Sequence, residues 1–312
     1  MGRRASLCRS GAELFAALVL PRLLHRWSES YRALLPSNTL ASSLVSALLI
    51  FAAVFLAAAF FEKRAGASLK RYLSRGFFND LLYGLFYQGG VYSLFIYQPW
   101  LNSLRPRLAI IDVNLLGSLP AYVSLPVYFL IVDLMGYLLH RLYHTRWLWP
   151  FHSVHHSQEN MTYLTSFRFH FVEQFLSNSA AIVPMLLLGA PAKVWLPVTV
   201  FGWLLQMSQH TELDWRMGPF YWVFAGPVFH SVHHSTDPAY FNKNFGMMFS
   251  FWDFLFGTAV DAPSRCRVYG VTGLEMPETI HGQFATPFRA VYRQMLPTPE
   301  AEQRTRSSKS PT

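Results

Sequence analysis

The sequence predicts an all-α protein: a multi-pass bundle of membrane helices that carries a helical cap. Three observations lead to this prediction. Hydrophobic residues make up 52% of the 312 residues and charged residues only 14%, where soluble globular chains carry about 25%. Uncharged apolar stretches of bilayer length recur along the chain, and the polar segment between them holds histidines at helical spacing. So few charges cannot coat a water-facing surface over this much apolar bulk, which disfavours a nucleic-acid-binding domain and a disordered chain.

The charge balance and the cysteine count narrow the class further. Lys and Arg number 26 against 17 Asp and Glu, a net charge of +9. This excess suits an anionic membrane surface or an acidic partner. Cys8 and Cys266 are too few for a disulfide framework or for an iron–sulfur cluster, which takes about four thiolates. The composition favours a membrane enzyme or a transporter.

Composition divides the chain into three parts. They are a basic, amphipathic segment (1–38), a membrane domain (39–260) and a soluble-looking extension with a disordered tail (261–312). We expect the first part to form a retained interfacial helix. A signal peptide is the weaker alternative, because Pro21 and Arg22 interrupt the apolar stretch and no clear small-residue cleavage site follows.

Three stretches of the membrane domain are long enough to cross a bilayer core, which takes about 20 residues. They are Thr39–Phe61, Leu81–Leu101 and Ser118–Leu139. The loop at 62–80 carries more Lys and Arg than the loop at 102–118. By the positive-inside rule, the more basic loop faces the cytoplasm.

A fourth apolar region predicts a helical hairpin. Its halves, Ala180–Gly189 and Val194–Met207, meet at a helix-breaking turn around Pro191. A hairpin that dips into the membrane and returns leaves the polar segments 140–178 and 208–260 on one side. That side is the one assigned to the basic loop, the cytoplasmic side.

The histidines are concentrated in those polar segments. Ten of the twelve lie between His140 and His234, less than a third of the chain, and the hexapeptide HSVHHS occurs at both 152–157 and 230–235. On a helix, histidines three and four residues apart lie on neighbouring positions of one side. His170 and His210 stand alone; the other eight form one HxxxH box and two HxxHH boxes: His140, His144; His152, His155, His156; His230, His233, His234.

These boxes predict a metal site. A lone histidine is usually a polar residue whose hydrogen bonds are made by its neighbours. Several imidazoles gathered together repel one another when protonated and fill a core poorly when neutral. A cation that takes their lone pairs is the simplest reason to gather them. Eight imidazoles exceed the needs of one tetrahedral zinc ion. The pattern therefore predicts two metal ions of higher coordination number, with positions left for water or dioxygen.

The order HRxxH, HxxHH, HxxHH among membrane helices resembles the fatty acid hydroxylase/sterol desaturase superfamily of integral-membrane di-iron oxygenases, over roughly residues 80–260. The flanking sequences match as well: DLMGYLLHR at 133–141, NKNFG at 242–246 and WDFLFGT at 252–258. The resemblance implies a four-helix membrane stem and a cytosolic cap that holds two irons. It also implies oxygen-dependent hydroxylation or desaturation of lipids.

The resemblance further implies which residues ligate iron and carry catalysis. His210 occupies the position of an additional family ligand at the end of the returning hairpin helix, although Gln206 stands where relatives often have one more histidine. His170 is a candidate ligand, a neighbour of the ligands or a packing residue. Leu138 and Leu139 replace a tryptophan common before the first box, which leaves the substrate open. The implied ligands are His140, His144, His152, His155, His156, His210, His230, His233 and His234.

Carboxylates near the boxes are candidates to support the ligands. A metal-bound imidazole usually donates its other N–H to a carboxylate or a carbonyl. Asp133 precedes His140 by two helical turns. The other candidates are Glu159, Glu173, Asp237 and Asp253. For each, a helix cap or an ion pair with an arginine is the alternative.

The predicted activity needs partners that the chain lacks. The hypothesis is a hydroxylase that uses two iron ions and O2 on a membrane lipid of the fatty acyl, sterol or alkyl-glycerol type, with desaturation at the same site as the alternative. The sequence contains no GxGxxG loop after a strand and no clustered thiols. We therefore expect electrons from an external cytochrome, ferredoxin or reductase that docks on basic loops beside the metals.

Two hypotheses from other classes compete. A metal transporter that passes ions between histidines predicts histidines within the spans and on both faces of the membrane. The boxes lie outside the spans on one inferred face, which disfavours it. An inactive scaffold with the same fold is disfavoured by the intact boxes.

Overall fold

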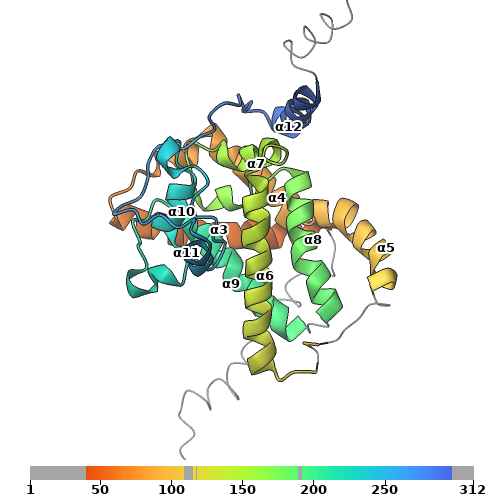
Figure 1. Ribbon diagram of the computed structural model, residues 1–312. Helices are drawn as coiled ribbons and strands as arrows, with labels where there is room; N and C mark the ends of the chain where they lie inside the picture. The colour runs from red at the N-terminus through yellow and green to blue at the C-terminus, as the bar shows by residue number, and fades with distance from the viewer. Residues whose placement is uncertain (1–39, 109–114, 117, 189–191, 297–312) are drawn as a thin grey trace, which may run out of the picture.

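The computed structural model describes residues 40–108, 115–116, 118–188 and 192–296 (Figure 1). Within these residues the regular structure is helical, apart from two isolated β-bridges. The all-α prediction is therefore confirmed for this part of the chain. The segment 1–38 and the tail from Thr298 lie outside the described residues.

The four longest helices are arranged around α6, which runs side by side with α8 and packs against α9 (Figure 1), while α3 packs on the helix Arg75–Gln88. Their bounds are α3 (Leu40–Arg64), α6 (Ala121–Tyr143), α8 (Phe171–Leu188) and α9 (Ala192–Gln209). Among the described helices, α3 and α6 are long and apolar enough to cross a membrane, as predicted for the first and third spans. Leu49, Leu56 and Phe60 on α3 are each more than half exposed, which suits contact with lipid.

The second predicted span, Leu81–Leu101, is wrong as a single helix. The chain turns at Gly89 and Gly90, and Gly90 adopts a φ of +91°, which disfavours residues with a side chain. A Cβ atom on Gly89 would collide with the carbonyl of Leu85 and with Leu44 of α3. The two glycines therefore end one helix and let it approach α3. The segment consists of α4 (Arg75–Gln88), the π-helical turn η3 (Ser93–Tyr97) and α5 (Gln98–Leu108).

Two helices, α8 and α9, occupy the region of the predicted hairpin, and at 18 residues each they are longer than expected. The connection at 189–191 lies outside the described residues. Helix α8 begins at Phe171, so its first turns take over the end of the polar segment 140–178. This difference places Glu173 and Gln174 on a bundle helix instead of a cap loop.

Short helices form the cap at the C-terminal end of α6 (Figure 1). Helix α12 packs on α7, and α10 packs on α9. The cap elements are η2 (Leu69–Leu73), α7 (Trp149–His156), η5 (Tyr163–Phe167), η6 (Gly218–Trp222), α10 (Pro227–His233), η7 (Pro238–Tyr240), α11 (Phe251–Phe256) and α12 (Ile280–Met295).

A buried ion pair joins the cap to α4. Asp80 is fully buried and accepts a hydrogen bond of 2.5 Å from Nε of Arg168, the residue after η5. Gln158 and Thr165 donate to the same carboxylate at 2.7 and 2.9 Å. A buried charge is tolerated when it is paired and hydrogen-bonded throughout, as it is here. This network fixes η5 and the end of α7 on the bundle.

Candidate metal centre

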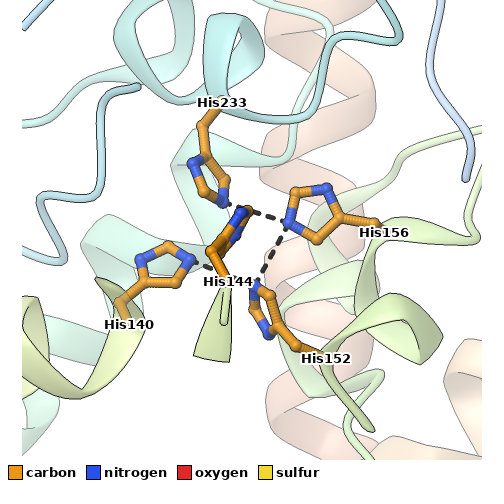
Figure 2. A group of neighbouring side chains, drawn as sticks. All are labelled: His140, His144, His152, His156 and His233. Atoms are coloured by element: carbon orange, nitrogen blue, oxygen red, sulfur yellow. Dashed lines mark hydrogen bonds between the residues drawn. The ribbon is translucent and has the colours of Figure 1, made fainter. Parts of the chain in front are cut away.

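The structure brings the nine predicted histidines into two adjacent groups. In each group, one ring nitrogen from every residue lies within 4.8 Å of the others. The first group comprises His140, His144, His152, His156 and His233, whose rings point toward a common centre (Figure 2). The second group comprises His155, His210, His230 and His234. His144 is half-buried and the other eight are buried.

Both copies of HSVHHS fold as short helices with a proline in the first turn. Pro150 is the second residue of α7, and Pro227 is the first residue of α10. Proline is favoured there because the first turn of a helix does not use its backbone N–H groups. The valines in the middle of the two hexapeptides, Val154 and Val232, are completely buried. Each hexapeptide thus packs its valine inward and presents its histidines to the centre.

The two copies divide their histidines in opposite ways. On α7, His152 and His156 belong to the first group and His155 to the second. In the second hexapeptide, His233 belongs to the first group, and His230 and His234 belong to the second. Positions i and i+4 lie about 40° apart around a helix, whereas i+3 lies about 60° to the other side. Each short helix therefore spans both groups. The sequence had indicated three imidazoles on one side of a helix, and this division was not foreseen.

Hydrogen bonds at Nδ1 fix the tautomer of four of these histidines. Carbonyl and carboxylate oxygens accept hydrogen bonds, so each of these Nδ1 atoms carries a proton and leaves Nε2 with a free lone pair. The pairs are His140 with the Phe245 carbonyl (2.8 Å), His152 with Glu173 Oε1 (2.6 Å), His210 with the Gln206 carbonyl (2.8 Å) and His233 with the Lys243 carbonyl (2.9 Å).

In the first group, two Nε2 atoms lie close together without a proton to share. His140 Nε2 and His152 Nε2 are 3.1 Å apart although both rings carry their proton on Nδ1. His210 and His230 show the same 3.1 Å separation in the second group. Ligands at right angles around a metal with bonds of about 2.1 Å would lie about 3 Å apart. The buried Nε2 of His144 has no hydrogen-bond partner among the described residues. This donor set fits a metal ion in each group.

The electrostatic environment keeps the rings neutral. Burial, and after it the neighbouring imidazoles, lowers the pKa of His155, His156 and His234 well below the ordinary value. Burial lowers the pKa of His210 to about 4. Neutral imidazole is the form that binds metals. Near neutral pH these lone pairs are therefore available for coordination.

A strained loop supplies the carbonyls that hold two histidines of the first group. Asn242 and Asn244 have φ values of +59° and +57°, in the left-handed region. The backbone between and after them directs the carbonyls of Lys243 and Phe245 to His233 and His140. Asp253, which the sequence had proposed as a partner of a histidine, instead accepts hydrogen bonds from the amides of residues 245 and 246.

Asn244 provides a test of this loop. Its completely buried side chain donates to the carbonyls of Phe229 and Val260 and accepts from the Val260 amide. Asn244→Gly should lower the free energy of unfolding by about 2–3 kcal/mol, because it removes these bonds. Asn244→Ala should cost about 1 kcal/mol more, since alanine is strained at positive φ. Denaturant unfolding and metal analysis measure both effects. Equal stability of the two variants would contradict the role of strain.

Asp133 was expected two turns above His140 on the same side of the helix, supporting that ligand. The expectation is wrong: its carboxylate accepts from the amides of Met248 and Phe249 and from the indole N–H of Trp252. It anchors the segment after the loop to α6 and supports the histidines only indirectly. Glu173 alone among the five candidate carboxylates bonds a cluster histidine directly within the described part of the chain.

Three further candidates lie outside the two groups. His170 accepts a hydrogen bond at Nδ1 from the Val172 amide and donates at Nε2 to the Phe284 carbonyl, so both ring nitrogens are used. Glu159 is exposed, and Asp237 caps η7. The alternative of a packing role is the one that fits His170.

His170→Gln is accordingly expected to keep the metal content of the wild-type chain. It should lower the melting temperature, because the buried ring joins α12 to the start of α8 and each lost hydrogen bond costs about 1 kcal/mol. Elemental analysis and thermal unfolding of one preparation give both values. Loss of a metal ion without loss of folded protein would make His170 a ligand.

Two cavities reach the histidines. The first, of about 260 Å³, is lined by α6, α8 and α9 and ends at His140 and His152 of the first group and at His155, His210 and His230 of the second. The second, of about 240 Å³, is lined by cap residues and reaches His144, His156 and His233 of the first group. Of these two cavities, only the first is lined by histidines of both groups.

Comparison with known proteins agrees with this site. The fatty acid hydroxylase family model matches residues 125–258, within the predicted membrane domain. The chain is 34% identical over 154 residues to the ornithine lipid hydroxylase of Rhizobium tropici, covering 49% of this chain and 46% of that protein. It is 37% identical over 146 residues to the alkylglycerol monooxygenase of Danio rerio, covering 46% and 32%. It is 30% identical over 141 residues to a methylsterol monooxygenase of Arabidopsis thaliana, covering 42% and 50%.

The fold and the site define a helical protein with a buried histidine centre suited to two metals. The chain resembles the fatty acid hydroxylase/sterol desaturase superfamily in its central part, residues 125–258. It spans about half or less of the length of these curated relatives. No solved structure matches it. The boundaries of the three predicted parts stay predictions.

Proposed function

We propose that this protein is a membrane-bound, O2-dependent di-iron oxygenase that hydroxylates a lipid. One observation carries the proposal: nine imidazoles, each with a ring nitrogen close to those of its neighbours, form two metal-sized groups at the end of a cavity between apolar helices. Acid–base side chains do not attack unactivated C–H bonds, so an oxidising metal pair is the chemistry that such a site would serve. Similarity to a hydroxylase and a monooxygenase supports oxygen insertion.

The nine histidines are proposed as the catalytic iron ligands, five for one ion and four for the other. Two bound iron ions would supply reduction of dioxygen and abstraction of hydrogen from the lipid. The protein orients the ligands and keeps bulk water out. Glu173 and the carbonyls of Lys243 and Phe245 hold protons on Nδ1, so that Nε2 faces the metals. Met247 and Met248 line the cavity beside the histidines and keep that wall apolar.

The proposed membrane arrangement follows from the apolar helices. Helices α3 and α6 cross the bilayer, α8 and α9 enter and return, and the cap lies on the cytoplasmic side. The lipid then reaches the cavity laterally, between the helices. Electrons come from an external cytochrome, ferredoxin or reductase.

Desaturation at the same site is the alternative reaction. Lipid analysis of cells with and without the chain, grown under ¹⁸O2, tests both together. Hydroxylation adds one labelled oxygen to a lipid, and desaturation removes two hydrogens without label. We expect a labelled hydroxylated lipid that disappears with His230→Ala. An unchanged lipid profile from protein that carries two irons and receives electrons would refute the proposal. Metal uptake by cells without any lipid change would favour a transporter.

A further inference from the structure

The second cavity joins the surface of the cap to the first histidine group. We call it the cap cavity; residues of the segments 144–156, 233–242 and 270–272 line it. Phe241 and Thr272 in its lining are exposed, whereas His156 and His233 are buried. His144, which also lines it, is the one member of the nine that is only half-buried. The cap cavity therefore leads from the solvent to the ligands of the first group.

The lining of the cap cavity suits water. Ser235 and Thr272 contribute hydroxyl groups, and Asn242 contributes an amide. Water held inside a protein needs polar partners of this kind, and a cavity of about 240 Å³ has room for several molecules. The first cavity instead runs between α6 and α8, where Val132 and Ala181 are part of its lining. An alkyl chain fits that surface better than water does.

The two cavities reach the first group on different histidines. The first cavity ends at His140 and His152, and the cap cavity reaches His144, His156 and His233. Among the described residues, no histidine of this group lines both cavities. A lipid in the first cavity would therefore leave the side of the group that faces the cap cavity free.

One wall of the cap cavity comes from a segment that follows the family match. The Thr236 amide donates to the Val268 carbonyl at 3.2 Å, and Ser235 forms an isolated β-bridge with Tyr269. These contacts hold the segment 268–272 beside the end of the second hexapeptide. The family model matches the chain only as far as residue 258. This wall is therefore a feature of the present chain and not of the matched domain.

The proposed reaction needs exchange with water. Hydroxylation combines one C–H bond, one O2, two electrons and two protons, and it yields one C–OH group and one water molecule. The external donor supplies the electrons. The protons and the water have to pass between the solvent and the metals while the lipid occupies the first cavity. In addition, nine neutral imidazoles leave the charge of two bound cations largely uncompensated, which attracts small anions.

Resting on the proposed function, we propose that the cap cavity is a solvent port for the metal centre. Single water molecules and small inorganic anions reach the first group through it, on the side opposite to the lipid. The two protons consumed and the water molecule formed in each turnover pass the same way. The lipid thus enters from between the helices, and the water-borne reactants enter through the cap.

The rate of azide association with iron-loaded holoprotein in phosphatidylcholine nanodiscs tests the port. Azide is a small anion that produces an absorption band when it binds ferric iron, so stopped-flow absorbance follows its arrival without turnover. Thr272→Cys is loaded with iron and then labelled with a bulky maleimide, which closes the exposed mouth of the cavity. We expect labelling to slow azide association about tenfold or more, with both irons kept. The unlabelled sample of the same folded preparation is the reference.

Two controls accompany this measurement. Wild-type protein treated with the maleimide accounts for labelling of Cys8 and Cys266. Ala181→Phe narrows the first cavity instead and should keep the wild-type azide rate. An unchanged rate after labelling of Thr272→Cys, or an equal slowing in Ala181→Phe, overturns the port, while lipid oxidation by the same preparation leaves the proposed function standing. Protein that binds no iron would refute the proposed function and the port with it.

Discussion

Replacing His155 or His233 by alanine is expected to reduce lipid oxidation by about 10³-fold or more, equivalent to about 4 kcal/mol in the activation barrier. Each is the single histidine that its short helix contributes to one of the groups, His155 to the second and His233 to the first. Removing either leaves a metal short of a ligand. Elemental analysis should show fewer than two metals per chain in either variant, and ¹⁸O incorporation measures the remaining turnover.

His281→Ala is the control for these variants. His281 is exposed on α12, and within the described part of the chain its ring pairs with Thr279, which is not a member of the cluster. It should keep both metals and full activity. Two metals per chain in both His155→Ala and His233→Ala, with folded protein, would remove the ligand assignment.

Glu173→Leu is expected to weaken metal binding in the first group by 10- to 100-fold, the range seen when partners of metal-bound histidines are removed. The carboxylate lies 2.6 Å from His152 Nδ1 and is as deeply buried as that ring. Without it, the ring loses the acceptor that fixes its tautomer and its orientation. Glu173→Gln keeps an acceptor oxygen without the charge and should lose less. Competition with a chelator measures the affinities.

Glu159→Gln serves as the matched carboxylate control, because Glu159 follows the same histidine box but is exposed. Its metal affinity should equal that of the wild-type protein. An unchanged affinity in Glu173→Leu would show that the ring of His152 is held by packing alone, and the proposed role of the carboxylate would be abandoned.

Local sequence predicted those features of the structure that depend on a single helix. Histidine spacing within α7 and α10 predicted which residues gather, because a helix places i and i+4 side by side. The length of the uncharged apolar stretches predicted α3 and α6. The same criterion failed for Leu81–Leu101, because hydropathy does not show that α4 ends at Gly89 and Gly90, where it lies against α3. It also failed for Asp133, because spacing along α6 does not reveal which loop folds back onto it.

The sequence by itself determined the helical class, the apolar helices α3 and α6 and the eight histidines of the three boxes, since composition and spacing belong to single segments; the family resemblance added His210. Only the tertiary structure decided how those histidines divide into groups of five and four, and which carbonyls and which carboxylate orient them. Histidines of α7 meet His233 of α10 and His210 after α9, and the 242–246 loop bonds histidines of α6 and α10. Such contacts depend on how packed helices are oriented, and no local periodicity encodes that orientation.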